Sequence, residues 1–297
     1  MRRPYFTLAL LLPCLLLGNQ DSHAETSSFD PFLVGGSLES MHSGTVSDAE
    51  ISFQLLFNEI LAGLGIRFTI KIYDDDKTLL DYFDKGEVNA FFISALHFLD
   101  IEESTHPRAR YVVQYGPSLK QRYLLLKRNT EKSLDLKEFK NRKLSYSRGH
   151  QVGKRFLDIT LIENGLQNSE GFFSLIETTK DANSAIVDLF FHNTDLALVP
   201  ENSFNIAKEL NPQIGRKLSV LISSEPMIFQ VVGFSRNFPE DKIARFDPFL
   251  LASEPNKRLK QVMRTFGVHS LHRAEEETLK EVREINNRYF SATGRNQ

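Results

Sequence analysis

The chain has almost no cysteine, since Cys14 is the single one among 297 residues. It lies in an apolar run over 8–17 that we expect to be removed from the mature protein. A disulfide, a thiolate nucleophile and a cysteine-bound metal are therefore excluded for the mature chain. Its stability must come from buried apolar side chains, and the remaining length is enough for two lobes of ordinary domain size.

The chain also has little excess charge of either sign, because 36 Lys and Arg side chains nearly balance 38 Asp and Glu and leave a net charge of −2 at pH 7. The two signs are mixed along the chain, so nothing favours nucleic acid or an anionic membrane surface as a partner. The eight histidines show no metal-ligand spacing, and the sequence has no glycine-rich phosphate loop and no nucleophile elbow. We therefore expect no metal, no cofactor and no enzymatic activity.

The N-terminus has the layout of a secretory signal peptide. Arg2 and Arg3 precede the apolar run, and Ser22 and Ala24 are small residues of the kind that a signal peptidase accepts. The run has roughly half of the ~20 residues needed to span a bilayer, and no later apolar stretch is long enough. We expect cleavage near Ala24 and a free protein of the bacterial periplasm. The alternative is an uncleaved N-terminal anchor.

Strands and helices alternate along the mature chain. The pattern predicts strands over 32–38, 68–72 and 90–95, with helices over 47–64 and 77–85 between them. The same order returns later in the chain. This second copy consists of strands over 143–146, 172–177 and 196–199 and of helices over 151–164 and 182–191.

Two such copies predict an α/β protein with two sheets, because strands that alternate with helices of this length form parallel sheets through right-handed crossovers. The alternative is one doubly wound domain. Two further pairs of strands favour two lobes, since they look like an outbound and a return crossing between the copies. These pairs lie over 111–115 and 123–127 and over 217–222 and 229–234.

The return crossing makes the first lobe discontinuous. We expect this lobe to comprise 25–115 plus 230–297 and the second lobe to comprise 116–229. Two connecting segments act as a hinge, because a few residues at strand ends can absorb the rotation that closes a cleft. After Pro239 the sequence has only helical character, most clearly over 256–266 and 275–290.

Four segments carry a resemblance to a known family: 61–66, 79–90, 134–147 and 184–200. In this order they resemble the type II periplasmic binding proteins, in particular the phosphate, phosphite and phosphonate transporter-binding family. The resemblance implies two lobes, each a mostly parallel sheet flanked by helices, joined by two crossing segments. It also implies capture of a small anionic solute between the lobes and its delivery to an ABC-type membrane permease without chemistry on the ligand. We expect the protein to be a monomer.

The start of the helix after the strand over 143–146 is the first candidate for the ligand site. Ser147, Arg148, Gly149 and His150 lie there, where ligands collect in parallel sheets and where unpaired amides and the helix dipole favour an oxyanion. The alternative is an N-cap serine followed by a surface loop. The resemblance puts small hydroxyl residues at the positions of Arg148 and His150. This difference from the family favours an acid with a planar two-oxygen group over phosphonate, because an arginine side chain matches two oxygens in one plane.

Five further residues are candidates for the ligand site. Four of them match ligand positions through the resemblance, and Thr179 is a weaker candidate from its place in the chain. In the first lobe Ser37, Ser94 and His97 follow strands and are expected to face the cleft, although Ser94 can equally be an N-cap and His97 a surface residue. In the second lobe Thr179 lies in the loop before a helix, and Asp195 begins the last strand. A solvated carboxylate at the strand end is the alternative for Asp195.

Two other functional classes stay open from the sequence. The same fold can serve as a sensory or partner-binding module that feeds a membrane kinase or cyclase. A secreted enzyme is the third reading, and the missing catalytic constellation counts against it.

Overall fold

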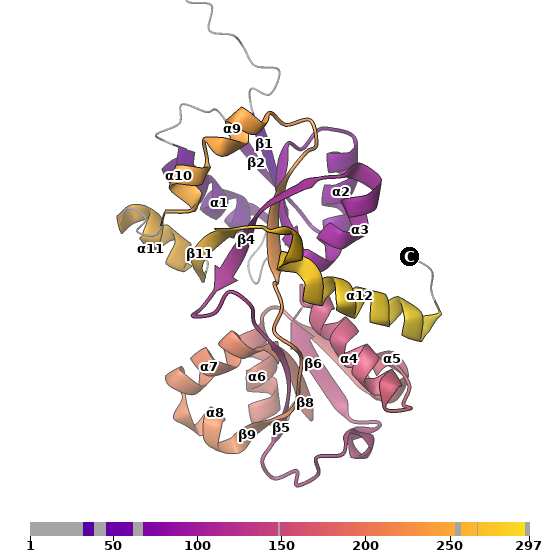
Figure 1. The fold of residues 1–297 in the computed structure, drawn as a ribbon. Coiled ribbons are helices and arrows are strands. Elements are labelled where there is room, and N and C mark those ends of the chain that lie inside the picture. Colours follow the sequence, from indigo (N-terminus) through magenta and orange to yellow (C-terminus); the bar gives the residue numbers. More distant parts are fainter. Residues whose placement is uncertain are drawn as a thin grey trace, which may run out of the picture.

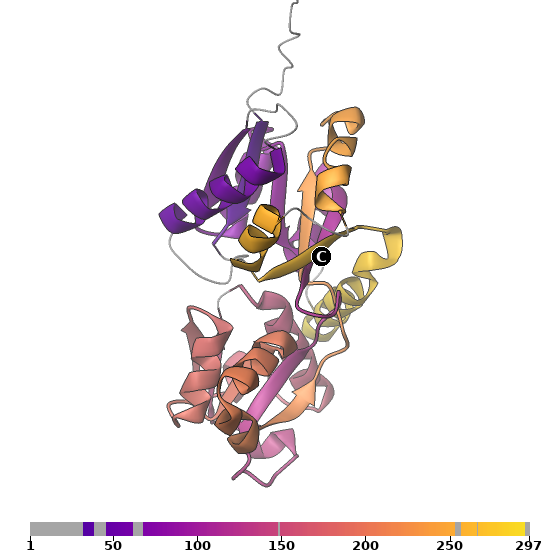
Figure 2. The same ribbon diagram turned by 90° about the vertical axis from the view of Figure 1, so that its left-hand side faces the viewer.

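The computed structural model describes residues 32–38, 46–61, 68–147, 149–252, 257–265 and 267–294. Two bodies lie one above the other and are joined by two crossing segments (Figures 1 and 2). The expected signal peptide and Arg148 lie outside the described residues. Within these ranges, no helix is long and apolar enough to span a membrane.

The first lobe contains a six-stranded sheet in the order β11-β4-β10-β3-β1-β2. The three strands at one end of this sheet are parallel and are linked by helices, as the alternating pattern predicted. They are β1 (Phe32–Ser37), β2 (Phe68–Tyr73) and β3 (Ala90–Ser94), with α1 (Val46–Leu61) and α2 (Asp76–Asp84) between them and α3 (Ala95–Thr105) after them. Strand β3 is buried along its whole length, which explains why its sequence is a continuous apolar run.

The second lobe contains a five-stranded sheet in the order β7-β6-β8-β5-β9. Its parallel strands are β6 (Lys143–Ser147), β7 (Leu175–Thr179) and β8 (Leu196–Pro200). The helices of this lobe are η1 (Leu136–Phe139), α4 (Gln151–Glu163), α5 (Ser169–Phe172), α6 (Ala182–Phe190), α7 (Glu201–Leu210) and α8 (Pro212–Lys217). The predicted strand over 172–177 lies later, because Asn168 caps the short helix α5 and the chain becomes extended only afterwards.

Each sheet takes one antiparallel strand from the segment that has just left the other lobe. After β4 (Arg108–Tyr115) the chain crosses to β5 (Tyr123–Arg128), which lies between β8 and β9. After β9 (Leu218–Ser223) it returns to β10 (Gln230–Phe234), which lies between β3 and β4. Apart from the additional edge strand β11 of the first sheet, the two sheets therefore have equivalent strand orders. The predicted α/β architecture of two lobes with two crossings is confirmed.

Close backbone contacts explain two glycines. A Cβ atom at Gly36 of β1 would lie 1.9 Å from the ring of Phe92, which itself stacks on Phe53 of α1 with ring centroids 4.5 Å apart. A Cβ atom at Gly153 of α4 would lie 2.5 Å from the ring of Tyr123. These glycines let a helix and a strand approach an aromatic ring on the neighbouring strand.

The C-terminal segment corrects one prediction, because it is not only helical. Strand β11 (Val268–Arg273) pairs antiparallel with β4 at the edge of the first sheet. Four of its six residues are polar and do not alternate strictly with apolar ones, so its pattern is too weak to be recognised in the sequence. The helices of this segment are α9 (Glu240–Ala244), α10 (Asp247–Leu250), α11 (Lys257–Thr265), η2 (Glu276–Leu279) and α12 (Lys280–Thr293).

Helix α12 contacts both lobes. It packs on α4 of the second lobe and on α3 of the first. Arg283 pairs with Glu102 of α3 at 2.7 Å, and Arg288 pairs with Glu163 of α4 at 2.7 Å.

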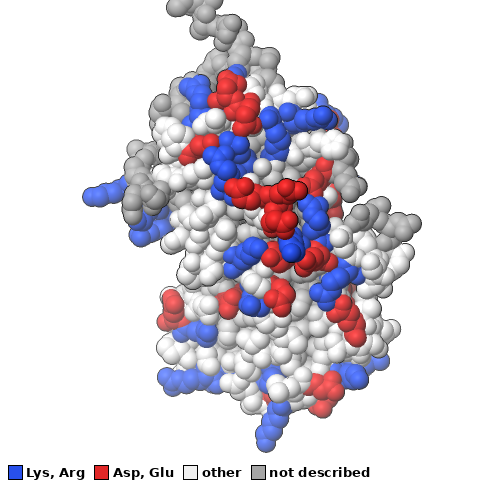
Figure 3. Space-filling model, viewed as in Figure 1, with Lys and Arg blue, Asp and Glu red and all other residues white. Residues whose placement is uncertain are grey.

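On the face of the molecule seen in Figure 1, charged side chains gather across the middle, whereas much of the second lobe is uncharged (Figure 3).

Candidate functional site

Three of the predicted site residues lie together in the first lobe. Ser37 ends β1, Ser94 ends β3, and His97 is in the first turn of α3. The Ser94 hydroxyl oxygen accepts a hydrogen bond from the backbone N–H of His97 at 3.2 Å and lies 2.9 Å from Nδ1 of the same residue. Ser94 is therefore the N-cap of α3, and its cap places it beside the imidazole.

Asp76 joins this group and was not predicted. It is the first residue of α2, its exposed fraction is 1%, and it accepts a hydrogen bond from the Ser37 hydroxyl and contacts Nδ1 of His97. Ser37, Asp76, Ser94 and His97 are hereafter the first-lobe cluster. The sequence signal that could have revealed Asp76 is its place just after a parallel strand, where polar groups collect at the carboxyl edge of the sheet.

The second lobe brings Ser147, Gly149 and His150 to the corresponding edge of its sheet. Ser147 ends β6, and Gly149 has a φ of 62°, in the left-handed region that favours glycine. His150 is the N-cap residue of α4 and is only 2% exposed. Its Nδ1 lies 3.0 Å from the hydroxyl of Tyr123, and burial raises the pKa of that tyrosine, so the hydroxyl stays protonated.

Phe229 in the return crossing links the two halves. Its carbonyl accepts a hydrogen bond of 2.8 Å from the N–H of Ala95, the residue after Ser94. Its ring stacks on Tyr123 with centroids 4.6 Å apart and lies 6.3 Å from the His150 ring. The N-termini of α3 and α4 are thus both beside the same residue of the return crossing, although they belong to different lobes.

Thr179 lies at the same edge as Ser147, because the two residues are partners in the parallel register of β7 and β6. Its hydroxyl donates a hydrogen bond of 2.8 Å to the carbonyl of Asp181, the N-cap residue of α6. Thr179 therefore belongs to the group of second-lobe candidates that the fold brings together.

The structure does not bring Asp195 to this edge. Asp195 precedes β8, so it lies where the parallel strands of the second sheet begin, and it accepts a hydrogen bond of 2.9 Å from the backbone N–H of Lys143 at the start of β6. Its other oxygen pairs with Arg128 at 3.0 Å. Burial opposes its ionisation, but the Lys143 N–H and the Arg128 guanidinium outweigh that effect and hold the pKa of Asp195 below its ordinary value.

The described part of the site is suited to an oxyanion through hydrogen bonds and helix dipoles. The hydroxyl of Ser147 and the imidazole of His150 lie where α4 begins, and the hydroxyl of Thr179 lies at the end of the adjacent strand, just before α6. Backbone N–H groups at a helix start have no partner within the helix. Within the described ranges, Asp76 is the one carboxylate of the first-lobe cluster. Among the described residues, no group of three His, Cys, Asp or Glu could hold a metal ion.

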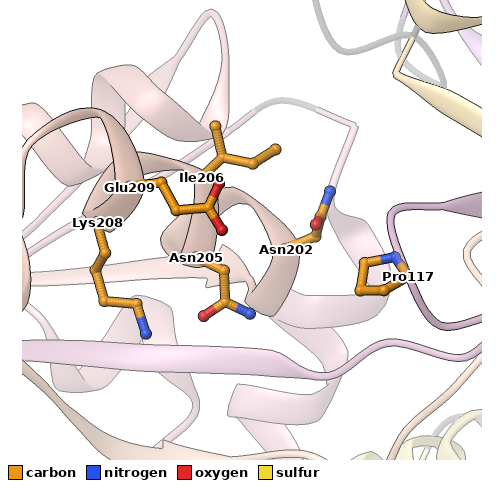
Figure 4. A pocket seen from close by; sticks show the side chains of 6 residues that line it. All are labelled: Pro117, Asn202, Asn205, Ile206, Lys208 and Glu209. Carbon is orange, nitrogen blue, oxygen red and sulfur yellow. The ribbon is translucent and has the colours of Figure 1, made fainter.

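A separate pocket of about 520 Å³ lies between the outbound crossing and α7 (Figure 4). None of the predicted site residues contributes to it. Its lining consists of Pro117, Asn202, Asn205, Ile206, Lys208 and Glu209. Gly116, with a φ of 79°, comes so close to Asn202 that a Cβ atom there would lie 2.4 Å from Oδ1.

Comparison with known proteins gives a family match over most of the chain. Residues 42–279 match the family described as the periplasmic substrate-binding protein of phosphonate ABC transporters. Among curated proteins, none matches the chain.

Solved structures with the same fold have little sequence identity with this chain. A binding protein component of an ABC phosphonate transporter from Pseudomonas aeruginosa is 10% identical with a TM-score of 0.67, over 89% of this chain and 88% of that one. PhnD1 from Prochlorococcus marinus in complex with methylphosphonate is 14% identical with a TM-score of 0.68, over 86% and 97%. A protein from Xanthomonas citri bound to ATP is 13% identical with a TM-score of 0.68, over 90% and 100%.

Proposed function

Because the chain belongs to the family of periplasmic substrate-binding proteins of phosphonate ABC transporters, we propose that it captures a small oxyanion between its two lobes. The family is one of transport proteins rather than enzymes, and it implies a small-molecule ligand and a membrane permease as partners. The finer proposals concern which residues bind, which acid is captured and how the lobes move.

One observation carries the proposed site: two groups of hydroxyl and imidazole side chains from different lobes lie beside the same hinge residue, Phe229. The first-lobe cluster lies at the N-terminus of α3, and Ser147 and His150 lie at the N-terminus of α4. A ligand that contacts both groups gains hydrogen bonds only when the lobes close on it. Its binding energy therefore favours the closed arrangement.

The nature of the acid follows from the groups at the start of α4. Gly149 permits a close approach of the backbone, and the helix dipole and unpaired N–H groups favour a negative oxygen. Arg148 stands in the same segment and supplies charge as well as a fork that matches two oxygens at once. We propose a small carboxylic or phosphonic acid, bound by the arginine and the hydroxyl groups of Ser147 and Thr179.

The lobes of this proposal are 25–115 plus 230–297 and 116–229, and they rotate about the two crossings. The family is periplasmic, and we propose that cleavage near Ala24 releases the chain as a free monomer. Mass spectrometry and size-exclusion chromatography of the exported protein test both statements.

Isothermal titration of the mature chain with phosphate, phosphite, methylphosphonate, acetate and succinate tests the function. We expect saturable binding of one equivalent of at least one of these anions. Arg148→Ala should weaken that binding by about tenfold or more while thermal stability stays near wild type, because a charge-assisted contact contributes about 1.5–3 kcal/mol.

Arg142→Ala is the matched control for the titration. Arg142 is a half-exposed arginine of the same lobe that lies 4.0 Å from Asp195, at the opposite edge of the sheet. Its removal should leave the affinity unchanged. A wild-type chain that binds none of these anions would refute the proposed function, and equal losses in both variants would refute the role of Arg148.

A further inference from the structure

Three successive aspartates after β2 have three different environments. Asp74 is exposed to solvent. Asp75 is the N-cap of α2 and accepts a hydrogen bond of 2.7 Å from the N–H of Thr78. Asp76 is buried, with an exposed fraction of 1%. A buried carboxylate is costly unless it is paired and hydrogen-bonded, so the contacts of Asp76 define what it does.

The two carboxylate oxygens of Asp76 contact different elements. Oδ1 accepts a hydrogen bond from the hydroxyl of Ser37 at the end of β1, and Oδ2 contacts Nδ1 of His97 on α3. An ionised carboxylate only accepts hydrogen bonds, so the geometry assigns a hydrogen to Nδ1 of His97. Asp76 therefore determines both the direction of the Ser37 hydroxyl hydrogen and the tautomer of His97.

A histidine held at Nδ1 by a carboxylate has a fixed ring orientation. The Ser94 oxygen lies 2.9 Å from the same Nδ1. The imidazole is thus held from α2 and from the start of α3 at once. The His97 side chain keeps an exposed fraction of 21%, whereas that of Asp76 is 2%.

We propose that Asp76 is a positioning residue for ligand binding, which orients Ser37 and His97 in the first-lobe half of the site. This inference rests on the proposed function, because it assumes that those two residues meet the ligand. Asp76 itself does not contact the ligand. A residue that only stabilised the lobe would tie β1, α2 and α3 together without effect on the imidazole tautomer or on affinity.

Two measurements on Asp76→Ala and Asp76→Asn separate positioning from stability. Two-dimensional NMR of ¹⁵N-histidine-labelled protein, at a pH where the rings are neutral, reports which nitrogen of His97 carries the hydrogen. We expect Nδ1–H in the wild type and a shift toward Nε2–H, the form that predominates in free histidine, in Asp76→Ala. Titration with inorganic phosphate and with methylphosphonate should show about tenfold weaker binding in Asp76→Ala.

The isosteric Asp76→Asn variant keeps the volume of the side chain and serves as a control in case Asp76→Ala fails to fold. Its single amide oxygen can accept from one of the two partners, so we expect a smaller loss of affinity than in Asp76→Ala. Asp74→Asn removes the same charge from an exposed neighbour and should leave both the tautomer and the affinity unchanged.

The outcomes distinguish this inference from the function on which it rests. A wild type that binds neither phosphate nor methylphosphonate, while His97 carries its hydrogen on Nδ1, counts against the proposed function and not against the orientation of the ring. A wild type that binds, together with Asp76 variants of equal or tighter affinity and an unchanged His97 tautomer, would overturn the positioning role. That result would leave Asp76 with a purely structural function.

Discussion

Removal of the Asp195 carboxylate should destabilise the second lobe and leave ligand affinity unchanged. Arg128 is largely buried, with 10% of its side chain exposed, and it pairs with Asp195 at 3.0 Å. It also donates to the carbonyl oxygens of Leu189 and Thr194. Asp195→Ala leaves this cation with carbonyl partners alone and leaves the N–H of Lys143 without its acceptor.

The size of the effect follows from the burial of the pair. Loss of one partner of a fully buried ion pair costs about 3–5 kcal/mol. The Asp195 side chain is 26% exposed, so solvent screening reduces this value, and we expect a loss of about 2 kcal/mol. Such a loss lowers the melting temperature by about 4–8 °C. Differential scanning calorimetry and urea denaturation of the mature protein measure it.

Acid provides an independent check of the same pair. The pKa of Asp195 is depressed in the folded state, so its contribution to stability is complete above the ordinary carboxyl pKa of about 3.9 and is lost as the pH falls through the lower folded value. The stability difference between wild type and Asp195→Ala should therefore be full near neutral pH and shrink in acid.

An exposed carboxylate of the same lobe is the control. Glu138→Ala changes the same charge on η1 and should alter neither stability nor affinity. The reasoning would be refuted if Asp195→Ala kept the wild-type melting temperature and weakened anion binding tenfold, because the carboxylate would then act on the ligand.

Two further substitutions test the packing around the site. Gly36→Ala should destabilise the first lobe by about 3 kcal/mol in urea denaturation, because the new Cβ atom would lie 1.9 Å from the ring of Phe92 and buried rings cannot move without strain; an unchanged midpoint would contradict this packing. Tyr123→Phe removes the hydroxyl that lies 3.0 Å from Nδ1 of His150, and should cost about 1 kcal/mol of stability and weaken binding of inorganic phosphate several-fold. Wild-type affinity in Tyr123→Phe would place His150 outside the site.

Most of the architecture could be predicted because parallel strands covered on both faces leave an unmistakable apolar run. Strand β3 and strand β8 are such runs, and each has a helix directly before it and another directly after it. Edge strands carry a weaker pattern. Strand β11 is half buried and contains two histidines and an arginine, so its sequence does not indicate a strand. It becomes a strand because it pairs with β4, a contact that the sequence alone does not reveal.

The site could be predicted only in part, for a geometrical reason. Residues that directly follow a parallel strand, such as Ser94 and Ser147, reach the common edge of the sheet wherever the strand ends. Asp195 precedes its strand, so the same rule places it at the opposite edge. The sequence does not distinguish Asp76 from Asp74. Which aspartate is buried depends on the residue at which α2 begins, and the sequence does not fix that residue.

Helix α12 couples the angle between the lobes to partly exposed ion pairs outside the candidate site. Its Arg283 is anchored on α3 and its Arg288 on α4, while Lys120 of the outbound crossing pairs with Glu281 at 2.7 Å. Rotation of one lobe against the other must stretch or exchange at least one of these anchors. Under the proposed function, the resting balance between open and closed lobes therefore depends on residues outside the candidate site, and substitutions along α12 can change the affinity without touching the solute.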